Sequence, residues 1–170
     1  MSKEAYPLGA PALDDLIRAS LKYKDRAYAP YSKFRVGAAL LSADGQIFGG
    51  CNVENASYGA GICAERTAIV KAISEGQNEF LAVVVSSDVP APTTSPCGIC
   101  RQFLREFLSP NVPIYFVSSA YPLKGGIPSW LGEIEIESQE AGQYIKKMTM
   151  EELLPNSFGP DNLGIKDPQR

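Results

Sequence analysis

Three cysteines and one glutamate have the residue types and the spacing of a catalytic metal site. Cys63 and Glu65 lie in the segment Cys-Ala-Glu-Arg, and Cys97 and Cys100 form a Cys-x-x-Cys pair. Thiolates are good zinc ligands, and a tetrahedral zinc ion with three protein ligands keeps its fourth position for water. Zinc makes hydroxide available near neutral pH, and a neighbouring carboxylate can carry protons between that water and a substrate. These four residues predict one Zn²⁺ per chain, with Glu65 as the catalytic proton carrier.

The charge of such a site must be offset by positive groups. A zinc ion and three thiolates together carry a net negative charge, and a bound hydroxide makes that charge more negative. So negative a centre would hold the proton of its bound water too tightly. Cys63 and Cys97 are expected where helices begin, and the free N–H groups and dipole of a helix N-terminus favour thiolates. Arg66 or Arg101 can supply a full positive charge, and Arg66 is the preferred candidate for charge compensation.

The same residues also permit plainer interpretations. Cys63, Cys97 and Cys100 can form a structural zinc site or be buried thiols, and Cys97 with Cys100 can act as a redox dithiol. A lone Glu65 can be a solvated helix residue, which is the usual fate of glutamate. Cys51 falls in an expected strand, so we expect it to pack in the core rather than bind metal.

Length and composition narrow the classes of function. The 170 residues fit a single domain, residues 1–170. The chain contains no histidine, which excludes Ser-His-Asp and Cys-His catalysis and histidine-ligated metals. The net charge is −3 without a basic run, and binding to a polynucleotide depends on clustered Lys and Arg. A small-molecule partner is therefore expected, and no nucleic acid.

The N-terminal residues and the hydropathy of the chain indicate the expected cellular compartment. Residues 1–10 lack the basic stretch and apolar core of a signal peptide. The longest apolar runs are far shorter than the roughly 20 residues that cross a bilayer. We expect a soluble cytoplasmic protein without a membrane partner, in which reducing conditions favour metal-binding or free thiols over disulfides.

Hydrophobic periodicity predicts an alternation of helices and strands. Helices are expected at Pro11–Ala27, Ile62–Ser74 and Cys97–Leu108. Strands are expected at Phe34–Leu41, Gln46–Val53, Phe80–Ser87, Ile114–Ser118 and Tyr144–Met148. This order predicts an α/β fold, a three-layer α-β-α sandwich with a mixed five-stranded sheet.

The pattern is weaker after Ala120. Tyr121–Pro128 is rich in Gly and Pro, Glu133–Glu137 alternates like an exposed strand, and Pro155–Pro168 is typical of an irregular tail.

Five segments carry a resemblance to a known family. Cys-Ala-Glu followed by Pro-Cys-x-x-Cys resembles the signature of the cytidine deaminase superfamily. Three further segments resemble the free-nucleoside cytidine deaminases of that superfamily, namely Tyr31–Leu40, Gly50–Gly59 and Glu152–Pro160. The resemblance covers about residues 10–120 and 145–163, and together these motifs are highly specific.

The resemblance implies roles for residues that contact the substrate. The positions of Asn52 and Glu54 hydrogen-bond the ribose 3′-hydroxyl in this family, which ribose and deoxyribose share, and Phe34 stacks on the pyrimidine. The N–H of Ala64 and the carbonyl of Ser95 meet the edge of the base. From the residues alone, core packing would be favoured for Phe34, and Asn52 and Glu54 could be turn residues that close the hairpin.

The resemblance also implies an assembly. In the small-subunit members of the family, the positions of Ala56, Tyr58 and Phe158 reach a neighbouring subunit's active site. We therefore expect a homotetramer with shared active sites, although Phe158 by itself could be a simple hydrophobic staple for the tail.

The expected activity is zinc-dependent hydrolytic deamination of cytidine and deoxycytidine to uridine and deoxyuridine, in pyrimidine salvage. The alternatives are a deaminase of the blasticidin type, whose relatives lack the Asn-x-Glu sugar contacts, a redox dithiol protein, and an inactive zinc-binding module. One segment departs from the compact members of the family, because about residues 120–143 are longer than the short turn found there. We expect a surface insertion anchored by Trp130.

Overall fold

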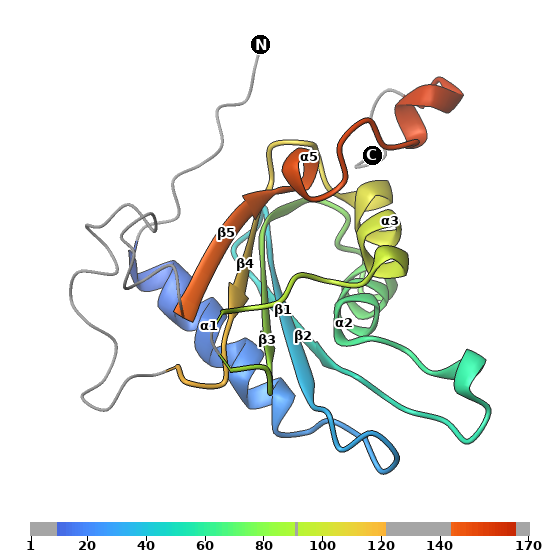
Figure 1. The fold of residues 1–170 in the computed structure, drawn as a ribbon. Helices are drawn as coiled ribbons and strands as arrows, with labels where there is room; N and C mark the ends of the chain where they lie inside the picture. The colour runs from blue at the N-terminus through green and yellow to red at the C-terminus, as the bar shows by residue number, and fades with distance from the viewer. Residues whose placement is uncertain (1–9, 91, 122–143, 166–170) are drawn as a thin grey trace.

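The structure, a computed structural model, describes residues 10–90, 92–121 and 144–165. These residues form a five-stranded sheet with helices on both faces (Figure 1). The strands are β1 (Val36–Ser42), β2 (Ile47–Cys51), β3 (Phe80–Ser87), β4 (Pro113–Val117) and β5 (Ile145–Thr149). Their order across the sheet is β2-β1-β3-β4-β5, with β3 and β4 parallel and the other neighbours antiparallel. The predicted α-β-α sandwich with a mixed sheet is confirmed.

The helices divide between the two faces. Helix α1 (Ala10–Lys24) covers one face, while α2 (Ala64–Ser74) and α3 (Gly98–Phe107) cover the other (Figure 1). The short helix α5 (Met150–Leu153) and two 3₁₀ turns, η1 (Tyr58–Ala60) and η3 (Pro160–Leu163), complete the described elements. None of the helices in the described residues is both long enough and apolar enough to span a membrane.

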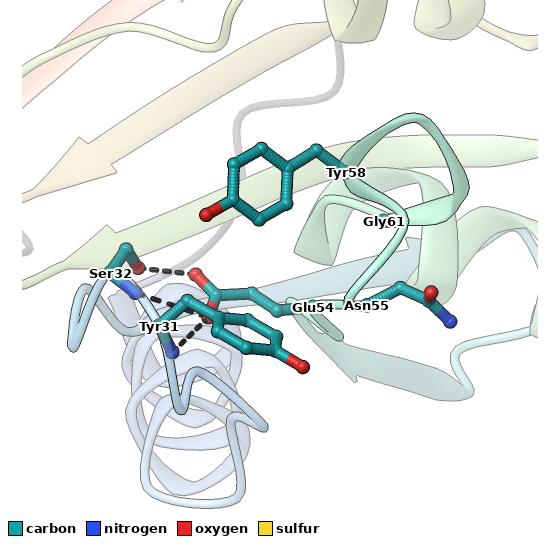
Figure 2. Close-up of a pocket in the computed structure, with 6 residues that line it drawn as sticks. All are labelled: Tyr31, Ser32, Glu54, Asn55, Tyr58 and Gly61. Atoms are coloured by element: carbon teal, nitrogen blue, oxygen red, sulfur yellow. Dashed lines mark hydrogen bonds between the residues drawn. The ribbon is translucent and has the colours of Figure 1, made fainter.

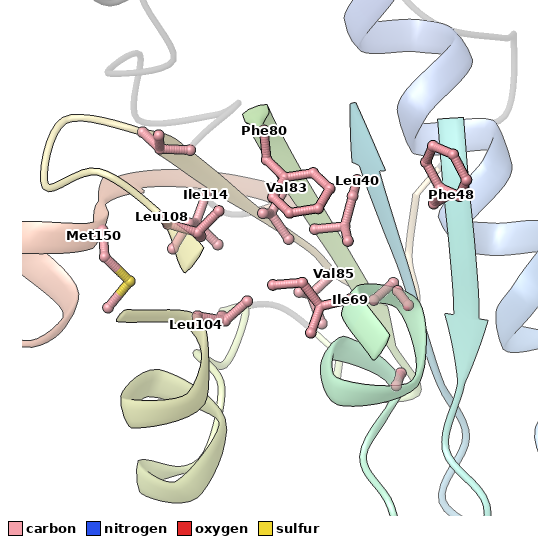
Figure 3. Close-up of a cluster of buried hydrophobic side chains, with 14 of the residues drawn as sticks. Leu40, Phe48, Ile69, Phe80, Val83, Val85, Leu104, Leu108, Ile114 and Met150 are labelled. Carbon is pink, nitrogen blue, oxygen red and sulfur yellow. The ribbon is translucent and has the colours of Figure 1, made fainter. Parts of the chain in front are cut away.

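The central strands have apolar residues on both faces, because each face carries a core. In β1, Ala38 and Leu40 pack beneath α2 and α3, while Ala39 and Leu41 pack against α1. Side chains alternate between the two faces of a strand, so a strand covered on both sides must be apolar throughout. Figure 3 shows the larger core between the sheet and the helices α2 and α3.

Close packing at Gly50 brings α2 onto the sheet. A Cβ atom at this position would lie 2.9 Å from the carbonyl oxygen of Ala64 and from Cα of Ala68. Both are backbone atoms of α2 and cannot move aside as a flexible side chain would. The glycine therefore permits the helix that begins at Cys63 to lie directly against β2.

The expected elements agree with the observed ones to within a few residues, and the differences are informative. Phe34 precedes β1 and is 39% exposed, so the plain assignment of Phe34 to the core is wrong. Strand β2 ends at Cys51, before Asn52. Cys51 is only half-buried and its Sγ lies 3.4 Å from the carbonyl oxygen of Arg26, so it was wrong to expect Cys51 in the core.

The C-terminal segment is more regular than expected. Helix α5 was not predicted, and Thr149 caps it through a reciprocal hydrogen-bonded pair with Glu152. Part of the expected irregular tail forms η3, which begins at Pro160. The strand expected at Glu133–Glu137 and the anchor expected at Trp130 lie outside the described residues.

Candidate metal centre and active site

The three cysteine sulfurs of the predicted metal site come together at the beginnings of two helices. Cys63 is the N-cap residue of α2, Cys97 is the N-cap residue of α3, and Cys100 lies in the first turn of α3. Their Sγ atoms all lie within 4.8 Å of one another. Both N-caps have extended backbone, and each is followed by the free N–H groups of a helix N-terminus.

The spacing of the sulfurs fits a tetrahedral zinc ion. The Sγ atoms of Cys63 and Cys97 lie 4.0 Å apart. With zinc–sulfur distances of about 2.3 Å, the sulfurs of a tetrahedral site lie about 3.8 Å apart. Cys100 is buried, Cys63 is half-buried and Cys97 is exposed. The cluster therefore has one side in the protein and one side exposed to solvent, and its donor set fits zinc.

Hydrogen bonds within the cluster favour a thiolate. The hydrogen bond from Cys100 lowers the pKa of Cys63 to about 5 against the effect of burial, and Arg66 contributes in the same direction. The same contact raises the pKa of Cys100, because that thiol acts as the donor. A thiolate is the form in which cysteine binds metal.

Arg66 is placed to compensate the charge of the cluster. Its Nη2 lies 3.9 Å from Sγ of Cys63 and donates to the carbonyl oxygen of Gly61 at 3.2 Å. Arg101, the alternative considered from the sequence, donates instead to the hydroxyl of Ser95 at 2.6 Å and to the carbonyl oxygen of Pro96 at 2.8 Å. The geometry favours Arg66, while Arg101 holds the loop that leads into α3.

Glu65 is buried beside the metal cluster. The residue is 4% exposed and lies in the first turn of α2. Burial raises the pKa of its carboxyl group to about 7, with a smaller contribution from the negative charge of Cys63. A carboxyl group with a pKa near the working pH can both accept and donate a proton. The burial and the raised pKa of Glu65 suit the proton carrier predicted from the sequence, and that role stays a prediction.

A pocket of about 360 Å³ is lined by residues of the loop before β1 and of the loop after β2. Figure 2 shows the residues that line it, which are Tyr31, Ser32, Glu54, Asn55, Tyr58 and Gly61. The rings of Tyr31 and Tyr58 lie 6.0 Å apart, centroid to centroid. Of these residues, only Glu54 and Tyr58 were assigned a role from the sequence.

The carboxylate of Glu54 organises the pocket wall. It accepts hydrogen bonds from the backbone N–H groups of Tyr31 at 2.9 Å and of Ser32 at 3.3 Å, and from the Ser32 hydroxyl (Figure 2). The hydrogen bond from the Ser32 hydroxyl is the main cause of the lowered pKa of Glu54. Glu54 is therefore an ionised acceptor at neutral pH, in contact with the segment that leads to Phe34.

Asn52 holds the same segment from the other side. Its Oδ1 accepts from the backbone N–H of Val36 at 2.8 Å, and its Nδ2 donates to the carbonyl oxygen of Phe34 at 2.8 Å. The hydroxyl of Ser32 also accepts from the N–H of Phe34 at 3.0 Å. Asn52 and Glu54 thus both bind the chain around Phe34, and one N–H of the Asn52 amide is still available to a ligand.

The remaining residues expected to contact a substrate fall into two groups. Ala64 is buried at the start of α2 and Ser95 is half-buried before Cys97. By contrast, Tyr58 is 81% exposed, Phe158 is 60% exposed, and Ala56 is exposed. The exposed group is the one assigned to a neighbouring subunit's site.

Sequence reasoning missed Tyr31, Ser32, Asn55 and Gly61 as lining residues, and it did not assign the role of Arg101. Tyr31 and Ser32 lie in one of the segments that carried the family resemblance, which was the available signal. Nothing in their types alone indicates that Glu54, more than 20 positions later, accepts their backbone N–H groups.

Comparisons with known proteins identify the family. The family model described as the cytidine and deoxycytidylate deaminase zinc-binding region matches residues 12–116. A cytidine deaminase of Sporosarcina psychrophila is 41% identical over 151 residues, covering 89% of this chain and 94% of the relative. A probable cytidine deaminase of Dictyostelium discoideum is 39% identical over 157 residues, covering 92% of this chain and 90% of the relative.

Solved structures show the same relationship. The crystal structure of cytidine deaminase from Burkholderia pseudomallei matches with a TM-score of 0.68 and 36% identity, covering 85% of this chain and 98% of that one. The structure of cytidine deaminase from Mycobacterium tuberculosis matches with a TM-score of 0.63 and 29% identity, covering 86% and 97%. The chain belongs to the cytidine and deoxycytidylate deaminase family of zinc-binding proteins.

Proposed function

We propose that this protein is a zinc-dependent deaminase of free cytidine and deoxycytidine, which releases ammonia and forms uridine or deoxyuridine. The observation that carries the proposal is the meeting of three cysteine sulfurs with the buried carboxyl group of Glu65 at the start of α2. The relatives and solved structures named as cytidine deaminases support the choice of substrate.

Cys63, Cys97 and Cys100 would hold the metal. When bound, zinc would act as a Lewis acid that makes hydroxide available near neutral pH. Glu65 accepts a proton from the attacking water and delivers it to N3 of the cytosine ring. The oxygen of that water forms a C–O bond at C4. Glu65 then transfers the second proton of the water to the departing amino group, so that the C–N bond breaks and ammonia leaves. Arg66 limits the negative charge of the cluster while this occurs.

The substrate-binding roles inferred from the family suit the chemistry of the residues concerned, of which Glu54 lines the pocket. Ionised Glu54 and the free N–H of Asn52 can bind a sugar hydroxyl, and the partly exposed ring of Phe34 can stack on a pyrimidine. The N–H of Ala64 and the carbonyl of Ser95 can meet the edge of the base. Because the 3′-hydroxyl occurs in both sugars, we propose that cytidine and deoxycytidine are both substrates.

We further propose that the protein is a homotetramer whose active sites are shared. Tyr58 and Phe158 are large and mostly exposed, and aromatic side chains are enriched at the buried centres of interfaces. With Ala56, they would contact the substrate in a neighbouring copy. Residues 1–170 then act as one domain with an insertion at about 120–143.

The free cysteines fit a reducing compartment, so we propose a cytoplasmic role in pyrimidine salvage. The net charge of −3 supports a free nucleoside rather than a polynucleotide as the substrate.

Two alternatives are less well supported. A deaminase of the blasticidin type would lack the Asn-x-Glu pair, which is present here as Asn52 and Glu54. A redox dithiol of Cys97 and Cys100 leaves unexplained why the sulfur of Cys63 lies 4.0 Å from that of Cys97.

The proposal is tested by measuring zinc content and ammonia release together. We expect one zinc per chain by atomic absorption and deamination of cytidine, and deamination of blasticidin much slower than that of cytidine. The Glu65→Gln variant should keep its zinc and lose nearly all turnover. Zinc-loaded protein that does not deaminate cytidine would contradict the activity, and a Glu65→Gln variant with substantial turnover would contradict the role of Glu65.

A further inference from the structure

Side chains of α3 hold the C-terminal segment that carries Phe158. Nε2 of Gln102 donates to the carbonyl oxygen of Phe158 at 2.9 Å. Nε of Arg105 donates to the hydroxyl of Ser157 at 3.0 Å, and its Nη2 pairs with the carboxylate of Asp161. These contacts lie on both sides of Phe158, so they fix the backbone from which its ring projects.

The guanidinium of Arg105 is unusually well buried for an arginine at the molecular surface. The residue is 8% exposed, whereas the side chain of its partner Asp161 is 62% exposed. A buried charge is costly unless hydrogen bonds satisfy it. Here the hydrogen bonds of the guanidinium run to the C-terminal segment, while Phe158 between them is 60% exposed. The segment is thus ordered by Arg105 without burying the aromatic ring.

Gly159 allows the backbone to lie directly on this guanidinium. A Cβ atom at residue 159 would lie 2.6 Å from Nη2 and 2.7 Å from Nη1 of Arg105. The N–H of Gly159 donates to Oδ1 of Asn162 at 2.8 Å, which fixes the turn on the far side. Only a residue without a side chain permits this close approach, so the contact can be disturbed from either partner.

The same helix carries two of the three metal ligands. Cys97 caps α3 and Cys100 lies in its first turn, while Gln102 and Arg105 follow along the same rigid element. Figure 1 shows the C-terminal segment beside α3. The place of Phe158 relative to the metal cluster of its own chain is therefore set through α3.

We propose that Arg105 is a positioning residue that controls nucleoside affinity through Phe158. The proposal rests on the proposed function, in which Phe158 contacts the substrate bound in a neighbouring copy. Arg105 itself touches no substrate. It holds the backbone on both sides of Phe158 in one arrangement, so the ring is presented to the neighbouring site without first having to be ordered.

The first test compares steady-state kinetics of single variants. Arg105→Gln should raise KM for cytidine about tenfold, leave kcat within about twofold, and keep one zinc per chain. Gly159→Ala should act in the same direction, because the added methyl group displaces the guanidinium. Arg18→Gln is the matched control, since Arg18 is an exposed arginine paired with Asp14 on α1, and it should change neither constant. Unchanged KM in both Arg105→Gln and Gly159→Ala would overturn the proposal.

The decisive test is a double-mutant cycle. Phe158→Ala alone should raise KM, and adding Arg105→Gln to it should raise KM no further, because the ring on which Arg105 acts is gone. A general structural role of Arg105 would give the same additional loss in both backgrounds. Additive effects would therefore overturn the proposal. Should Arg105→Gln fail to fold, Gly159→Ala takes its place in the cycle.

Hydrogen exchange separates this proposal from the proposed function. Amides of residues 157–161 should exchange faster in Arg105→Gln than in the wild type or in Arg18→Gln. Wild-type protein without cytidine deaminase activity would defeat the proposed function, whatever the exchange result. Unchanged protection of residues 157–161 would defeat the positioning role even in a fully active enzyme.

Discussion

The sulfur of Cys63 lies 4.0 Å from the sulfur of Cys97, although 34 positions separate them in the sequence. Each residue caps a different helix, so the helices α2 and α3 bring the sulfurs together with their own N-termini. Cys100 closes the triangle from the first turn of α3. Because the ligands come from two packed helices, metal binding should also hold those helices together.

Removing one of these ligands should therefore affect both metal content and stability. Loss of a residue that only hydrogen-bonds a metal ligand lowers metal affinity about 10–100-fold. Cys100→Ser removes a ligand itself, so zinc affinity should fall by more than this, and the melting temperature should fall as well. Atomic absorption and a thermal melt measure the two effects. Cys51→Ser is the control, because Cys51 is half-buried beside the carbonyl oxygen of Arg26 and is not part of the sulfur cluster. Equal zinc content in the two variants would disprove the ligand set.

The charge of Arg66 should matter more for turnover than for metal retention. Arg66→Gln removes a guanidinium 3.9 Å from Sγ of Cys63, which leaves the cluster more negative and its water proton harder to remove. We expect zinc to stay bound and kcat to fall about 10–100-fold, which corresponds to about 1.4–2.7 kcal/mol. Arg66→Lys keeps the charge and should recover part of the rate. Equal kcat in Arg66→Gln and the wild type would rule out charge compensation.

Ser32 should affect substrate binding although no role was assigned to it from the sequence. Its hydroxyl donates to Glu54 and accepts from the N–H of Phe34, so it links two residues proposed to contact the substrate. Ser32→Ala should raise KM for cytidine about three- to tenfold with little change in kcat, because binding and not chemistry is disturbed. Ser74→Ala is the matched control, because the Ser74 hydroxyl donates to the carbonyl oxygen of Val70 within α2. If Ser32→Ala and Ser74→Ala have the same KM for cytidine, Ser32 does not affect substrate binding through Glu54 and Phe34.

The pH dependence of stability should report on Asp88. Its carboxylate bonds to the backbone N–H and the guanidinium of Arg35 and lies 3.4 Å from Nζ of Lys24. Although burial opposes them, the hydrogen bonds from Arg35 lower the pKa of Asp88. A group with a lowered pKa in the folded state stabilises the protein above the unfolded pKa of about 3.9, and this stabilisation is lost as the pH falls through the folded value.

Asp88→Asn should therefore reduce the free energy of unfolding at pH 7 by about 1–3 kcal/mol. The difference from the wild type should shrink as the pH falls below about 4. Denaturant titrations at several pH values measure both. Asp25→Asn is the control, since the side chain of Asp25 is 71% exposed and pairs with Arg35 only at 3.3 Å. A difference that stays constant down to low pH would show that ionisation of Asp88 is not the cause.

The sequence by itself determined the layered architecture and the metal chemistry. A continuous apolar run such as Phe80–Val85 requires burial on both faces of its strand, and the spacing between Cys97 and Cys100 places both on one helical turn. The absence of histidine left a carboxylate, a thiol, Lys or Tyr as the possible proton carrier, and the position of Glu65 beside Cys63 made it the predicted one. These inferences depend on local periodicity and residue chemistry, which a single sequence displays directly.

Only the tertiary structure decided how the distant side chains divide their roles. The sequence permitted Arg66 or Arg101 beside the sulfurs, and the structure directs Arg101 to the loop before α3 and Arg66 to Cys63. It also showed that Glu54 is held by the chain at Ser32, and that Arg105 holds the segment of Phe158. Each of these contacts joins parts of the chain that meet only after the sheet and helices have packed, and no local pattern encodes the direction in which a long side chain then points.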